Sequence, residues 1–122
     1  MFKQVRFLAL ACALALSTAA GCHIDNKGVM HSFGTFSTLV SATPDQAIAA
    51  AREVAKEMQL TEVVYTANSV EGKLIATSAD ERTYEFTTFA KGDRVTDLAV
   101  RVGTTGDKEK SFQIIDAIKV KL

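Results

Sequence analysis

The chain has 122 residues, of which 48% are apolar, and its 14 basic residues balance its 14 acidic ones. A chain of this length forms one domain around a single hydrophobic core. Because it has no excess of basic residues, it lacks the positive surface that nucleic-acid binding requires, and we expect no nucleic-acid partner.

The first 21 residues have the order of charged, apolar and small residues that is typical of a secretory signal. Lys3 and Arg6 precede an apolar run over residues 7–16, which is shorter than the ~20 residues that a transmembrane helix needs. Small residues follow, and the segment ends in Ala-Ala-Gly-Cys at residues 19–22. Such a segment predicts a cleavable signal over residues 1–21 rather than a membrane helix.

Residues 19–22 resemble the lipobox of bacterial lipoproteins. In that family a diacylglyceryl group is attached to the cysteine thiol, a dedicated peptidase cuts in front of the cysteine, and the new amine is often acylated. The resemblance implies cleavage between Gly21 and Cys22 and a lipid on Cys22 that holds the chain to a membrane. The alternative is an ordinary signal cut after Ala20, which would leave Cys22 as a free thiol in an oxidising compartment.

The resemblance also implies a location in the bacterial cell envelope. In Gram-negative lipoproteins an aspartate after the cysteine commonly retains the protein at the inner membrane, and here that position is His23. In such a cell the resemblance therefore implies the outer membrane, with the domain facing the periplasm.

Removal of the signal leaves 101 residues with a net charge of −2, because the signal carries two basic residues and no acidic one. Cys12 lies in the signal and Cys22 would carry the lipid, so no cysteine pair remains for a disulfide or a Cys-based metal site. Residues 22–32 are polar and show no periodicity, which predicts a tether of at most ~40 Å. The folded domain is then expected over residues 33–122.

The domain is predicted to begin with a strand and a helix. Residues 33–42 are rich in Thr, Val and Phe and predict the strand. Thr43 and Gln46 are spaced as a capping box around Pro44, a residue that suits the first helical position. The helix is expected to run to about Gln59 with a narrow, alanine-rich apolar stripe, which would allow it to lie close to a sheet.

Four more strands and a final helix follow. The strands are predicted over residues 62–67, 73–78, 82–90 and 94–102, and the helix over about residues 107–121. Short turns join the strands, which indicates antiparallel neighbours. In the third of these strands Phe89 is out of phase with Tyr84 and Phe86, and a β-bulge near residues 87–88 would correct the phase. The element order β-α-β-β-β-β-α predicts an α+β two-layer sandwich, an antiparallel sheet of about five strands with both helices on one face.

The stretch AVRVGTTGD, from Ala99 to Asp107, resembles a signature of a family of small bacterial lipoproteins that carry only a domain-of-unknown-function label. Its members share a lipobox, a strand leading to a capped helix, a strand meander and an RVGTxGD turn into a final helix. The resemblance covers most of residues 35–122. It implies the fold above and a place in the cell envelope, but no activity, ligand or catalytic residue.

The RVGTxGD turn is also a candidate anion-binding site. Its residues Gly103, Thr104, Thr105 and Gly106 come directly before the expected N-terminus of a helix, where free amides and the helix dipole attract anions. Asp107 favours the alternative, a tight turn closed by an aspartate N-cap. Its carboxylate would occupy the same amides and repel a phosphate.

Few other residues are candidates for metal binding or catalysis. His23, Asp25, Met30 and His31 could bind a metal in the tether, but a metal site usually needs three or four preset ligands. A solvated linker is therefore favoured, and we expect no metal and no cofactor. Because both histidines precede the domain, the commonest catalytic base is missing, and we expect no catalytic residues and no enzymatic activity.

Seven aromatic residues could line a ligand pocket, although in a domain this small they are expected to form the core. They are Phe33, Phe36, Tyr65, Tyr84, Phe86, Phe89 and Phe112. A pocket bounded by Tyr84, Phe86, Phe112 and Ile115 would favour a protein that binds a small ligand, whereas a filled core and an exposed apolar patch would favour one that binds a macromolecular partner.

The sequence favours a lipid-anchored envelope protein of unknown activity, a non-enzymatic binding or structural module that presents a sheet surface to an envelope protein or polymer. The alternative is a periplasmic lipoprotein that binds a small apolar or anionic ligand.

Overall fold

The computed structural model describes residues 23–24 and 28–122. The predicted signal, Cys22 and Asp25 lie outside the described residues. Within the described part of the chain, no helix has both the length and the apolar character that a membrane crossing requires.

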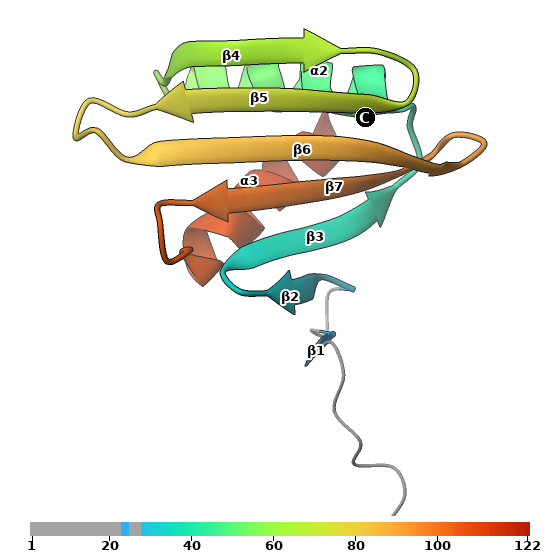
Figure 1. Cartoon of the computed structure of the whole chain (residues 1–122), viewed down its shortest axis with the longest axis horizontal. Helices are drawn as coiled ribbons and strands as arrows, with labels where there is room; N and C mark the ends of the chain where they lie inside the picture. The colour runs from blue at the N-terminus through green and yellow to red at the C-terminus, as the bar shows by residue number, and fades with distance from the viewer. Residues whose placement is uncertain (1–22, 25–27) are drawn as a thin grey trace, which may run out of the picture.

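The described chain folds into one antiparallel sheet with two helices packed on one of its faces (Figure 1). The strands are β1 (His23–Ile24), β2 (Met30–Ser32), β3 (Thr35–Val40), β4 (Thr61–Ala67), β5 (Glu71–Thr77), β6 (Thr83–Gly92) and β7 (Val95–Val102), and the helices are α2 (Pro44–Glu57) and α3 (Lys108–Val120). The sheet order is β1-β2-β3-β7-β6-β5-β4. The predicted α+β class is confirmed, because both predicted helices and all five predicted strands form close to their expected positions.

The predicted number of strands is too low. The sheet has six strands of three residues or more, not five, together with the two-residue β1. The additional strand is β2, which pairs with β3 but lies within the segment predicted as a tether. Its three residues are all exposed, so no apolar alternation marks the strand in the sequence. Val29, just before β2, is only 2% exposed, so the buried core extends into the segment predicted as a tether.

The predicted capping box forms at the start of α2. The Thr43 side chain accepts a hydrogen bond from the third helical amide, and Gln46 Oε1 accepts one from the Thr43 N–H at 3.1 Å. The hydrogen bond from the Thr43 side chain also lowers the pKa of Asp45 in the first turn. These contacts satisfy amides that would otherwise be free at the helix start, which fixes where α2 begins.

Helix α2 lies very close to the sheet, as its alanine-rich stripe predicted. At Gly72 in β5, an added Cβ atom would lie 2.8 Å from the Cγ2 atom of Ile48 in α2. Thr88 in β6 is buried, and its Oγ1 donates to the carbonyl oxygen of Pro44 at 3.0 Å. The glycine leaves room for the helix, and the threonine hydrogen bond holds the first turn of α2 over the sheet.

The core between the sheet and the helices is filled by apolar side chains. The largest of those buried to below 2% exposure include Phe86, Ile48, Leu74, Leu98, Ile115 and Ile118. The predicted aromatic core is wrong for two of its seven members, since Phe33 is 93% and Phe89 48% exposed.

The position of Phe89 follows from the register of β6. The pairing of β6 with β5 and β7 runs without a break through residues 87–89, so the bulge predicted near residues 87–88 is absent. The register shift lies between Ala90 and Gly92 instead. Phe89 therefore lies on the face of the sheet away from the helices, and Thr88 takes the inward position.

Candidate functional site

The predicted RVGTxGD turn forms between β7 and α3. Gly103 and Gly106 both have positive φ values, 72° and 83°. Glycine adopts this left-handed conformation without the steric cost that other residues meet. The two glycines are therefore explained by the path of the backbone.

The β7–α3 turn packs directly against the β2–β3 turn. A Cβ atom added to Gly106 would lie 2.3 Å from the carbonyl oxygen of Gly34, and one added to Gly34 would lie 2.5 Å from the carbonyl oxygen of Thr105. Both distances are far shorter than a real Cβ atom tolerates. The backbones of the two turns are thus in contact, and no ligand fits between them.

Arg101 holds the same two turns together. Its Nη1 donates to the carbonyl oxygen of Phe33 and to Thr35 Oγ1, the latter at 3.2 Å. Its Nη2 donates to the carbonyl oxygen of Thr104. The planar guanidinium spans both turns because its donors point in fixed directions. Arg101 is thus a structural residue of the signature, with its donors directed at protein acceptors.

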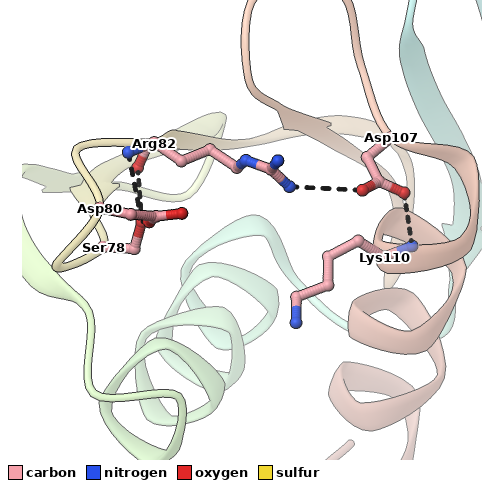
Figure 2. A network of polar contacts seen from close by, with 5 residues as sticks. All are labelled: Ser78, Asp80, Arg82, Asp107 and Lys110. Atoms are coloured by element: carbon pink, nitrogen blue, oxygen red, sulfur yellow. Dashed lines mark hydrogen bonds and ion pairs between the residues drawn. The ribbon is translucent and has the colours of Figure 1, made fainter.

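Asp107 caps α3 and pairs with an arginine from another turn (Figure 2). Its Oδ1 accepts from the Lys110 N–H at 3.1 Å, and its Oδ2 lies 3.4 Å from Arg82 Nη1. Arg82 follows the β5–β6 turn, so this ion pair links the end of that turn to the start of α3. Both side chains are well exposed, so the ion pair itself contributes little to stability.

These contacts account for Gly103, Thr104, Thr105 and Gly106 without an anion. The carboxylate of Asp107 already occupies one free amide of α3 and places negative charge where a phosphate would bind.

An open depression of about 540 Å³ lies between the β5–β6 turn and the β7–α3 turn. Its charged lining residues are Glu81, Arg82 and Asp107, and Arg82 is paired with Asp107. Close by, Ser78 Oγ donates to Asp80, and this hydrogen bond lowers the pKa of the Asp80 carboxyl (Figure 2). With two carboxylates against one paired arginine, the depression does not favour an anionic ligand.

The residues considered as metal ligands do not converge in the described structure. Met30 and His31 are neighbours on β2, so their side chains point to opposite faces of the sheet. The His31 ring stacks on Phe36 with centroids 4.5 Å apart, and its Nε2 accepts from the Gly34 N–H at 3.2 Å. In the described part of the chain, no group of three or more His, Cys, Asp or Glu side chains could hold a metal ion.

The aromatic pocket that would favour a small-ligand binder is filled. Tyr84, Phe86 and Ile115 are all at most 5% exposed. Phe112 is partly buried and packs edge-on against Phe36 with ring centroids 5.5 Å apart. Open depressions occur on the described surface, and five of them, of about 180 to 860 Å³, are lined by none of the four residues of the expected pocket.

Exposed apolar side chains occur near both edges of the sheet, a feature that the sequence analysis did not identify. Near β2 and β3 they are Met30, Phe33 and Leu39, and around β4 they are Val63, Val64 and Val70. Valines in a strand pattern predict a buried face, and only the sheet order reveals that β4 is an edge.

No curated protein matches the chain. A family model matches residues 5–121, almost the whole length, and its family is one of unknown function, as the sequence resemblance implied. The chain therefore belongs to the family described as "Protein of unknown function (DUF3568)".

Proposed function

We propose that this protein is a lipid-anchored, non-enzymatic module of the bacterial cell envelope, and that it binds an envelope protein through the free edge of β4. The anchor rests on the lipobox-like residues 19–22 and on the signal-like segment before them. The family match begins at residue 5, so the segment proposed as a signal belongs to the sequence that the family shares.

The sheet order separates the proposed anchor from the proposed binding edge. β1 directly follows Cys22 in the sequence and lies at one edge of the sheet, while β4 forms the other edge. Six steps between neighbouring strands, each of about 4.8 Å, place β4 roughly 29 Å from β1. A sheet attached to a membrane beside β1 would thus carry β4 away from the lipid surface, where another protein can reach it.

The uncovered edge of β4 is the observation that carries the binding proposal. Among the described residues, no strand pairs with its outer side. The Asn68 N–H donates inward to the Glu71 carbonyl at 3.0 Å. Because ladder bonds alternate along an antiparallel strand, Ala67 and Tyr65 present their N–H and C=O groups outward.

The side chains of β4 also favour an added strand. Val63 is 60% exposed and Val64 37%, and β4 contains neither the lysine nor the proline that commonly protects an edge from pairing. The register shift between Glu62 and Val64 interrupts the first part of the strand, so residues 64–67 are its regular portion. An extended segment of a partner could add to this portion by β-augmentation.

Two observations support a binding role over the alternatives. The filled core argues against a small-ligand binder whose site lies between sheet and helices. His31 is poorly placed to act as a general base, because its ring is stacked on Phe36 and its Nε2 already accepts a hydrogen bond.

Site-specific photo-crosslinking in the native envelope tests the binding edge. A photoreactive amino acid at Val63 in β4 is compared with one at Val120 near the end of α3, a valine that is also exposed. We expect a discrete crosslinked product from position 63 that is absent from position 120. Val64→Lys, which places a charge on the edge, should abolish the product without changing protein levels. Equal products from both positions, or a product insensitive to the lysine, would contradict the proposal.

A further inference from the structure

We propose that the β2–β3 turn, with Phe33 at its tip, inserts into the interfacial region of the lipid bilayer that holds the protein. The inference rests on the lipid anchor proposed above and adds a second point of contact, made by the folded domain itself. It follows from the conformation of Phe33, its exposure and its place beside β1.

Phe33 adopts a backbone conformation that is unfavourable for phenylalanine. The two-residue turn between β2 and β3 consists of Phe33 and Gly34, with φ values of 49° and 84°. Two positive φ values in succession are typical of a type I′ hairpin turn, whose first position favours Asn, Asp or Gly. A bulky residue in this conformation is an outlier. Such strain is retained where a residue has a role beyond folding.

The Phe33 side chain has almost no packing role in the domain. It is 93% exposed, the highest value among the large apolar residues that the structure describes as exposed. Met30, on the adjoining strand, is 40% exposed. A strained turn therefore presents an aromatic ring to the solvent, and the ring contributes little to the stability of the domain because it is hardly buried.

The pairing of β1 directs its N-terminal end toward this ring. His23 lies opposite His31 in the antiparallel pair of β1 and β2. The N-terminal end of β1 therefore faces the β2–β3 turn. Across a trans peptide, consecutive Cα atoms are only ~3.8 Å apart, so a lipid on Cys22 would be attached one residue from this end of β1. A lipid on Cys22 would bring the bilayer to the end of the sheet from which Phe33 protrudes.

The turn is held rigidly, which suits a contact that must remain extended. Arg101 donates to the Phe33 carbonyl oxygen, and Gly34 is in backbone contact with the β7–α3 turn. The charged residues at the C-terminal end of β7 (residues 101–102), in the adjoining turn and in the first turn of α3 do not oppose an anionic membrane, because their charges sum to +1. They are Arg101, Asp107, Lys108, Glu109 and Lys110.

A bilayer suits this tip because aromatic and large aliphatic side chains of surface-bound segments lie at the boundary between headgroups and acyl chains. A second copy of the chain could also cover the ring. We favour the bilayer over a second copy, because Cys22 directly precedes β1 in the sequence. A lipid on Cys22 would keep the bilayer near this edge of the sheet whenever the anchor is inserted.

Tryptophan fluorescence of the lipidated protein in vesicles tests the proposal. The chain has no tryptophan, so Phe33→Trp and the control Val70→Trp each give a single probe. Val70 precedes β5 at the far edge of the sheet and is 55% exposed. The vesicles contain phosphatidylethanolamine and phosphatidylglycerol, with or without bromine on the upper acyl chain. We expect a shift of emission to shorter wavelength and a loss of intensity with brominated lipid for position 33 only.

The outcomes separate this inference from the anchor on which it rests. If mass spectrometry shows lipid on Cys22 while emission from position 33 is unshifted and unquenched, the contact is wrong and the anchor stands. A shift without quenching by bromine means that protein covers the ring, which also overturns the contact. Absence of the lipid refutes the anchor instead. Should Phe33→Trp fail to fold, a nitroxide on Phe33→Cys must show the same burial by its reduced collision with aqueous nickel.

Discussion

Replacing Phe33 by asparagine should make the domain more stable, although it removes a large apolar side chain. Asparagine tolerates the left-handed conformation, and a non-glycine residue held there costs on the order of 1–3 kcal/mol. The ring is 93% exposed, so it buries about 15 Å² of a side chain of roughly 200 Å², which contributes at most about 0.4 kcal/mol. We expect the free energy of unfolding to rise by about 0.5–1 kcal/mol.

The assay is thermal and urea unfolding of residues 23–122, followed by circular dichroism. For a domain of this size the expected gain raises Tm by roughly 2–8 °C. Phe33→Ala is the matched control, because it removes the ring but keeps a residue with a Cβ atom at positive φ. It should leave Tm nearly unchanged. A fall in stability of more than about 1 kcal/mol for Phe33→Asn would refute the reasoning, since the ring would then make stabilising contacts within the domain.

Three further predictions concern the turns and helix ends. Gly106→Ala should lower the free energy of unfolding by about 2–4 kcal/mol in urea titrations, because the new Cβ atom meets backbone at 2.3 Å and φ is positive. Gly28→Ala, at a φ of 72° in open space, should cost only about 1 kcal/mol, and equal losses would contradict the close packing of the turns. Ser111→Ala should raise stability by about 1 kcal/mol, because the buried Ser111 Oγ has no hydrogen-bond partner in the described structure, and a loss would mean that it has one. The pKa values of Asp45 and Asp80 are lowered from 3.8 in the folded state. The two ionised carboxylates therefore stabilise the fold fully well above pH 4, and this stabilisation is lost as the pH falls through their folded-state pKa values. The urea concentration at the unfolding midpoint should therefore decrease as the pH is lowered below about 4. Asp45→Asn should reduce the slope of the midpoint against pH. An unchanged slope would contradict the assignment.

Much of the fold could be predicted from the sequence because its signals are local. The capping box of Thr43 and Gln46 depends on residues three apart, and it formed as expected. The turn at Gly103 and Gly106 depends on backbone freedom that only glycine supplies, and its aspartate cap on Lys110 N–H also formed as expected.

The features that the sequence did not reveal depend on distant partners. β2 is a strand only because β3 lies beside it, and its own residues show no apolar alternation. Thr96 is fully buried in β7 and donates to the Ala42 carbonyl oxygen, a contact across 54 positions of the chain. A threonine in a strand gives no sign of which carbonyl it will meet.

The candidate surfaces were missed for a similar reason. The sequence marks Phe33 as apolar and Val63 as a strand residue, and both patterns predict burial. Exposure follows instead from the two-residue turn that carries Phe33 and from the edge position of β4. Both features depend on which strands pair with one another, and local sequence patterns do not specify this pairing.

Intact-mass spectrometry of the protein purified from its native membrane tests the attachment of lipid to Cys22 most directly. We expect the mass of residues 22–122 increased by a diacylglyceryl group and, where the amine is acylated, by one further acyl chain. An unmodified chain that begins at Gly21 or at Met1 would contradict the anchor, and with it the orientation of the sheet and the bilayer contact of Phe33.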